Sequence, residues 1–210
     1  QTDIESVRGL IRAGLQTAAE KRNVPGSRAL LRALTAHDPD SRVFVLSGSP
    51  TQMREVLAAK LALDGIQVDQ LVLKNNLRNL RRGRLRAVRD QLGYKLPQLL
   101  MARGRSPADA TETLFGDDSE VDALVYAAYA AVVRGELDHQ GLSDLLTAGR
   151  AYPDAIQNAL DAAGTIQAHE AVEDIFIHLD RGVPAVRFQL LGPSIWPVFS
   201  WFQAGLRLAT

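Results

Sequence analysis

Short apolar runs that alternate with helix-forming segments constrain the fold of this 210-residue chain more than any other feature. Four such runs are bounded by turn-forming residues, as buried strands are, and they cover 43–46, 68–73, 113–115 and 175–179. Strands that alternate with helices are joined by right-handed crossovers and form a mostly parallel sheet. The sequence therefore predicts an α/β protein.

The segments between these runs repeat apolar residues at three- and four-residue steps, which is typical of amphipathic helices. The expected helices lie around 4–18, 30–34, 51–63, 96–100, 121–133, 138–149 and 153–164, with a last helix in the tail from Pro193 to Leu208. No linker interrupts the pattern, and the length fits one domain. We therefore expect a single domain over residues 1–210.

Charge and cysteine content exclude several function classes. The chain has 24 lysines and arginines and 24 acidic residues, so it lacks the basic excess of a nucleic-acid binder. Without cysteine it cannot form disulfides, thiolate zinc sites or a cysteine nucleophile. The start at Gln1 has neither a basic head nor an apolar core, and no run is long enough to span a bilayer. We expect a cytoplasmic protein.

Polar loops that follow the predicted strands are the candidate sites, because parallel sheets bind ligands beyond the carboxyl ends of their strands. After the first strand, Ser47 and the amide of Gly48 could hold a phosphate beside a helix N-terminus. A structural alternative is that Ser49 caps the next helix, with Pro50 as its first residue.

The loop after the third strand carries four acidic residues within six positions, among them Asp117, Asp118 and Asp122. Helix capping by Ser119 and Asp122 accounts for one or two of them. The remaining carboxylates repel one another unless a cation lies between them, and Mg²⁺ is bound by such oxygens together with substrate phosphate. The loop thus predicts Mg²⁺ binding as an alternative to capping.

Lys95 follows Gly93 and Tyr94, and we expect it to begin a helix. A lysine there is ordinarily solvated. If it points at a phosphate, it can stabilise the charge that develops during phosphoryl transfer.

The order of these features resembles the haloacid dehalogenase superfamily: Ser47 after one strand, then Lys95, then the acidic loop. Within it, the chain is similar to the catalytic domain of the actin-patch-associated phosphatidate phosphatase family. The similar segments are 24–26, the S-x-S-P of 43–50, 71–74, and the G-D-x-x-E-x-D-x-x-x-Y that ends at Tyr126. The resemblance spans about residues 1–130 and, more loosely, the strand at 174–179.

The resemblance implies a three-layer Rossmannoid fold without a cap domain and a Mg²⁺-dependent phosphomonoester hydrolase that forms an aspartyl-phosphate. Ser47 and the Gly48 amide would bind phosphoryl oxygens, and Lys95 would pair with the nucleophile and the phosphate. Asp117 would hold Mg²⁺, with Asp118 or Asp122 as the second acidic group. The substrate would be a phosphorylated small molecule or a phospholipid such as phosphatidate.

The chain departs from the family pattern at its start, because it lacks the D-x-D-x-T motif and the central strand that carries the nucleophile. We therefore expect an N-terminally incomplete domain that is inactive as given. The alternative is a non-catalytic module that keeps the fold and binds anionic or lipid phosphate ligands. Neither the substrate nor the oligomeric state follows from the sequence.

Two further features suggest contact with a membrane surface. Six arginines lie between Arg78 and Arg89, and the tail holds two tryptophans and two phenylalanines around Pro197. Arginine clusters bind anionic lipid headgroups, and tryptophan favours the bilayer boundary. The structural alternatives are a solvated basic face and a last helix packed on the sheet.

Overall fold

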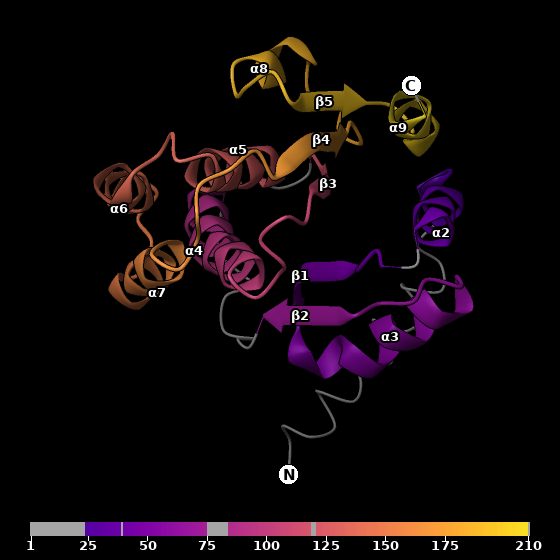
Figure 1. Ribbon diagram of the computed structural model, residues 1–210, viewed down its shortest axis with the longest axis horizontal. Coiled ribbons are helices and arrows are strands. Elements are labelled where there is room, and N and C mark those ends of the chain that lie inside the picture. The colour runs from indigo at the N-terminus through magenta and orange to yellow at the C-terminus, as the bar shows by residue number, and fades with distance from the viewer. Residues whose placement is uncertain (1–23, 39, 75–83, 119–120, 210) are drawn as a thin grey trace. The chain divides into compact units, whose positions relative to one another are not determined.

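The computed structural model describes residues 24–38, 40–74, 84–118 and 121–209, with the side chains of 84–90 and 189 left out. Contacts divide the chain into two compact units. The first unit comprises 1–78 and 200–210, and the second comprises 79–199. Every described strand pairs in parallel, which confirms the predicted α/β class with parallel sheets (Figure 1). None of the described helices is both long and apolar enough to cross a bilayer.

The first unit is built around a pair of parallel strands. Its elements are α2 (Ser27–His37), β1 (Phe44–Pro50), the 3-10 helix η1 (Thr51–Met53), α3 (Arg54–Leu63), β2 (Gln70–Lys74) and α9 (Trp201–Leu208). Phe44 pairs with Gln70, and the register continues to Ser47 opposite Leu73 before it shifts. The connection through η1 and α3 is the crossover that parallel strands require.

Helices α2 and α9 lie against each other within this unit. Gly26, which precedes α2, has a φ of +87°, a conformation that favours glycine. A Cβ at Gly26 would lie 3.4 Å from the backbone nitrogen of Phe202, and one at Gly205 would lie 3.5 Å from Leu30 Cδ1. The two glycines therefore allow the helices to approach closely.

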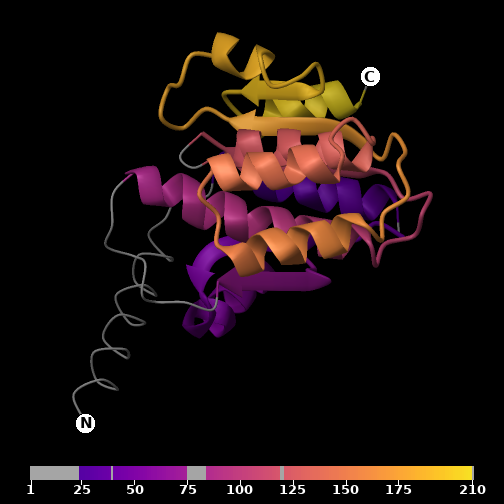
Figure 2. The ribbon, with the colours of Figure 1, turned by 90° about the vertical axis from the view of Figure 1, so that its left-hand side faces the viewer.

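The second unit contains a three-stranded parallel sheet and most of the helices. Its elements are α4 (Arg84–Arg103), β3 (Glu112–Asp117), α5 (Asp122–Val133), α6 (His139–Ala148), α7 (Pro153–Ala163), β4 (Val172–His178), α8 (Val186–Gln189) and β5 (Ile195–Val198). The strand order is β3-β4-β5. Figures 1 and 2 show α5 along one face of this sheet, with α4, α6 and α7 beyond it.

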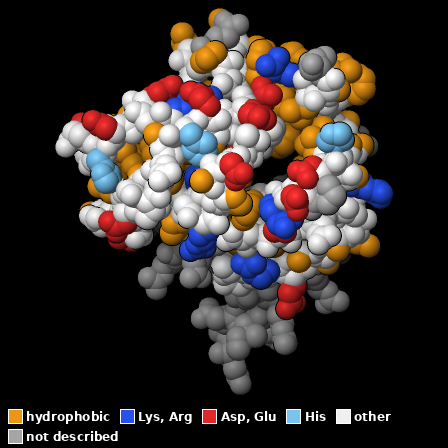
Figure 3. All heavy atoms as spheres, viewed as in Figure 1, with side chains coloured by type: hydrophobic (Ala, Val, Ile, Leu, Met, Phe, Trp, Pro, Cys, Tyr) orange, Lys and Arg blue, Asp and Glu red, His pale blue; other side chains and the backbone are white. Residues whose placement is uncertain are grey.

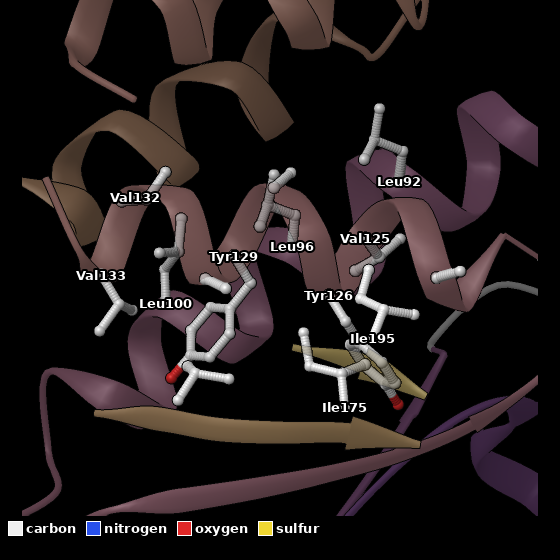
Figure 4. Packing of buried hydrophobic residues seen from close by; sticks show 14 of the residues in the cluster. Leu92, Leu96, Leu100, Val125, Tyr126, Tyr129, Val132, Val133, Ile175 and Ile195 are labelled. Atoms are coloured by element: carbon white, nitrogen blue, oxygen red, sulfur yellow. The ribbon is translucent and has the colours of Figure 1, made fainter. Parts of the chain in front are cut away.

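The core of the second unit lies between α4, α5 and the sheet (Figure 4). Leu92, Leu96 and Leu100 recur every four residues on α4 and are all at most 1% exposed. Helix α5 is apolar along nearly its whole length, as expected of a helix buried on more than one side. Packing of these side chains on Ile175 of β4 is the main source of stability in this unit.

A buried arginine connects the end of α4 to the start of β3. The guanidinium of Arg103 donates to Oε1 of Glu112 at 3.1 Å and to the carbonyls of Pro107, Ala108 and Ala110. It also lies 2.8 Å from Nε2 of His169. Because each of these oxygens would otherwise need water, Arg103 allows the loop before β3 to pack against the helix.

The tail differs from the predicted last helix. Residues 195–198 form strand β5 on the edge of the sheet, and the helix α9 begins only at Trp201. Pro197 explains the difference, because proline disrupts a helix interior but is tolerated on an edge strand. The prediction of one sheet also needs correction, since the described strands form two sheets. No strand in the described part of the chain pairs with both β1 and β3.

Some expectations fall on residues that the structure does not describe. The helix at 4–18, the acidic-loop residues Ser119 and Glu120, and the arginines of 78–83 lie outside the described residues. The side chains of Arg84, Arg86 and Arg89 do so too.

Candidate active site

Lys95 and Asp122 form a buried ion pair in the second unit. Nζ of Lys95 on α4 donates to Oδ1 of Asp122, the first residue of α5. The two residues are 4% and 7% exposed. Removing both charges from water is costly, so a buried pair is weak evidence for stability and a reason to look for chemistry.

The prediction that Lys95 begins a helix is wrong, because Lys95 lies well inside α4. The prediction placed Gly93 and Tyr94 just before the helix. Gly93 instead provides space within the helix, because a Cβ there would lie 3.2 Å from Cβ of Ala151, just before α7. This glycine therefore permits close helix packing rather than a turn.

Gly116 of β3 lies directly against Asp122. A Cβ at Gly116 would come within 2.8 Å of both Cβ of Asp122 and Cε2 of Tyr126. The hydroxyl of Tyr126 donates to the carbonyl of Phe115 at 3.0 Å. The start of α5 is thereby held on the carboxyl end of β3, which is where the sequence predicts a ligand site.

Asp117 is the last residue of β3 and pairs in register with His178, the last residue of β4. In a parallel sheet, residues in register project on the same face, so these two belong to one surface of the sheet. His178 is 7% exposed. The position of His178 beside Asp117 depends on strand register, which the pattern of residues does not reveal.

Asp118 supports the loop that follows β4. Its Oδ1 accepts hydrogen bonds from the amides of Asp180 and Arg181 at 2.8 and 2.9 Å, and its Oδ2 accepts one from Val183 at 3.1 Å. A carboxylate that accepts three amides serves as a loop anchor. This contact fits a structural role better than metal coordination.

The acidic residues offer a limited donor set for a cation. Among the described residues, no group of three or more histidine or acidic side chains is arranged to hold a metal ion. Asp122 faces Lys95 and Asp118 faces the loop amides. Asp117 is the residue for which the resemblance predicts Mg²⁺ binding, and Mg²⁺ typically takes one or two carboxylates with phosphate and water as its other ligands.

Ser47 and Gly48 lie in the first unit, near the end of β1. The hydroxyl oxygen of Ser47 accepts a hydrogen bond from the amide of Ser49 at 3.1 Å. The alternative in which Ser49 caps a helix beginning at Pro50 is wrong, because β1 continues through Pro50 and η1 begins at Thr51 without a side-chain cap.

The structure thus assembles Lys95, Asp117, Asp118 and Asp122 at one end of the second unit, and it assigns Ser47 and Gly48 to the first unit. Sequence reasoning had not given Gly116 a packing role. Its signal is a glycine at a strand end, six residues before the first residue of a helix.

No family model, curated protein or solved structure matches this chain.

Proposed function

We propose that this chain is the greater part of a Mg²⁺-dependent phosphomonoester hydrolase of haloacid dehalogenase type. The observation that carries the proposal is the buried Lys95–Asp122 pair at the carboxyl end of β3, the strand that ends at Asp117. A buried cation held by a carboxylate suits the charge that develops on a transferring phosphoryl group. The three-layer fold of that superfamily is part of the proposal.

Each residue has a defined part in the proposed reaction. In the proposed reaction, a carboxylate of the D-x-D-x-T motif, which the given sequence lacks, attacks phosphorus, the bond to the leaving oxygen breaks, and a second carboxyl group of that motif protonates the oxygen. Water then hydrolyses the aspartyl-phosphate and releases phosphate. Lys95 neutralises the phosphoryl oxygens, and Asp122 orients Lys95.

Asp117 would hold Mg²⁺, with water and phosphate oxygens as the other ligands. The cation would supply charge neutralisation at the phosphoryl group. Asp122, although named as an alternative second ligand, is better placed to position the lysine, because Lys95 occupies one of its oxygens.

The test uses the chain together with the residues encoded directly upstream of Gln1. We expect Mg²⁺-dependent hydrolysis of p-nitrophenyl phosphate, and its loss in Asp117→Asn. Asp144→Asn, which changes an exposed aspartate on α6, is the matched control and should keep full activity. Equal turnover in Asp117→Asn and in the control would disprove the assignment.

A second candidate is a non-catalytic module for anionic ligands. It is favoured by the engagement of Asp118 with loop amides and of Asp122 with Lys95, which leaves few carboxylates for catalysis. It predicts saturable binding of inorganic phosphate with no hydrolysis. Calorimetry should then show weaker binding in Lys95→Met than in Lys60→Met, a control in which a lysine of α3 is replaced.

A further inference from the structure

His178, the last residue of β4, is a buried histidine. His37 and His139 are exposed, and Figure 3 shows histidine and charged side chains on one face of the molecule, where water solvates them. His178 is instead 7% exposed. A buried imidazole carries an N–H group that bulk water does not reach, so this group needs a hydrogen-bond acceptor from the protein.

The strand pairing defines the face of the sheet on which His178 lies. Phe115 of β3 and Phe176 of β4 are in register, and their rings stack with centroids 5.5 Å apart. Side chains that are paired in register on these two strands therefore contact each other on this face. Since side chains alternate along a strand, the residues two positions further on lie on the same face, and these are Asp117 and His178.

The opposite face of the sheet packs on α5. Gly116 and Ile177 lie between the two pairs just described and are in register with each other. Gly116 lies against Asp122 of α5, and Ile177 belongs to the apolar core that this helix covers. Asp117 and His178 are thus on the face that is turned away from α5.

Asp117 is the polar neighbour of His178 within the sheet. On the β5 side, His178 is in register with Val198, which is apolar and buried. On the β3 side, it is in register with Asp117, whose carboxylate has two oxygens that accept hydrogen bonds. Of the two side chains that flank the imidazole in the sheet, the one on β3 is therefore the acceptor that a buried ring N–H requires.

Backbone hydrogen bonds fix this register up to the ends of the strands. The amide of Asp118 donates to the carbonyl of His178 at 3.0 Å, and the amide of Leu179 donates to the carbonyl of Val198 at 2.8 Å. Amides of the loop after β4 in turn donate to the carboxylate of Asp118. The strand ends that carry Asp117 and His178 are thus held together, and side chains on such strands are placed more precisely than side chains on loops.

We propose that His178 is a positioning residue for Asp117. A ring N–H of the imidazole donates to one oxygen of the carboxylate, which limits its rotation and leaves the other oxygen for a cation. Carboxylates that bind metals are themselves held by such hydrogen bonds, and loss of the outer partner typically lowers metal affinity about 10–100-fold. The inference deepens the proposed function and rests on it, because Asp117 is there the residue that would hold Mg²⁺.

The test is calorimetric titration of Mg²⁺ alone into the chain extended by the residues encoded directly upstream of Gln1. His178→Phe keeps a ring of similar size without the donor, and it should raise the Mg²⁺ dissociation constant about 10–100-fold. His178→Gln supplies an N–H donor again and should recover most of the affinity. His139→Phe, at an exposed histidine of α6, is the matched control and should bind Mg²⁺ as the parent does.

A second measurement needs neither metal nor hydrolysis. Urea unfolding of the same protein without Mg²⁺ is compared for His178→Phe, Asp117→Ala and the double variant. If the two side chains interact, the double variant should lose less stability than the sum of the two single losses. Additive losses would overturn the inference, since the two side chains would then not be coupled.

Two results of the Mg²⁺ titration would also overturn the inference while the proposed hydrolase stands. One is equal affinity in the parent and in His178→Phe. The other is an equal loss in His178→Phe and His178→Gln, which would show that only the packing of the ring matters. A parent that binds no Mg²⁺ would instead overturn the proposed hydrolase, and the role of His178 with it.

Discussion

Lys95 and Asp122 lie 27 residues apart in the chain and form an ion pair from which water is nearly excluded. The pair connects α4 to the first residue of α5. Gly116 lies beneath Asp122 and leaves no space for a larger residue. One buried interaction thus joins two helices at the carboxyl end of β3, where the candidate active site is located.

Lys95→Met should be strongly destabilising, because it leaves the Asp122 carboxylate buried without its cation. We expect the free energy of unfolding to fall by about 3–5 kcal/mol in urea titrations. The double variant Lys95→Met, Asp122→Leu should recover part of the loss, since neither charge then remains buried. Lys60→Met removes the lysine of a more exposed ion pair with Asp64, and it should lower the free energy of unfolding by less than about 1 kcal/mol. An equal cost at both lysines would contradict the importance of burial.

Gly116→Ala should destabilise the second unit by about 1–3 kcal/mol, because the new methyl group would meet Asp122 and Tyr126 at 2.8 Å. Thermal unfolding measures the loss. Gly164→Ala is the control, since a Cβ there would lie at an ordinary 3.5 Å from its nearest neighbour. If both variants unfold at the same temperature as the parent, then α5 can move away from β3 without a loss of stability, which would contradict this prediction.

Asp118→Ala should loosen the loop after β4, because three amides lose their acceptor. Hydrogen exchange should accelerate at Asp180, Arg181 and Val183, with a loss of about 1–2 kcal/mol in overall stability. Asp109→Ala, at an exposed position before β3, should change neither. Unchanged protection at these amides would show that the loop is held by other contacts.

Burial raises the pKa of the Tyr129 phenol, and the carboxylate of Glu112, which accepts its hydrogen bond, raises the pKa further. The folded state therefore keeps the phenolic proton above pH ~10, where an unfolded tyrosine releases it. The stabilising contribution is complete below that pH and is lost as the pH rises, by about 1.4 kcal/mol per pH unit.

Urea titrations between pH 9 and 11 should show this decline in the parent and a shallower one in Tyr129→Phe. Tyr152→Phe, which changes an exposed tyrosine, should decline as the parent does. A parent and a Tyr129→Phe variant with identical slopes would refute the role of the buried phenol.

Apolar pattern alone predicts most of the elements of this fold. The runs at 43–46, 68–73, 113–115 and 175–179 all lie in or next to strands, and the parallel pairing follows from their alternation with helices. The helices at 138–149 and 153–164 are observed within one residue of their predicted ends. These elements are local in the chain, so the apolar pattern of the residues that form each element is enough to predict it.

The strand β5 and the position of Lys95 could not be predicted in the same way. Pro197 is consistent with an edge strand only once β4 is present to pair with it. The prediction placed Gly93 just before the helix, whereas Gly93 lies inside α4, where the absence of a Cβ leaves space for Ala151. Both outcomes depend on neighbours distant in the chain.

The sequence by itself determined the class of fold, the order of its elements and the polar residues at the ends of its strands. Only the tertiary structure decided which partner each polar side chain meets: Asp122 faces a buried lysine, Asp118 faces loop amides, and Asp117 lies beside His178. The physical reason is that periodicity reflects which side of an element is buried. The partner of a buried charge is instead set by strand register and helix packing, which bring together residues that are far apart in the sequence.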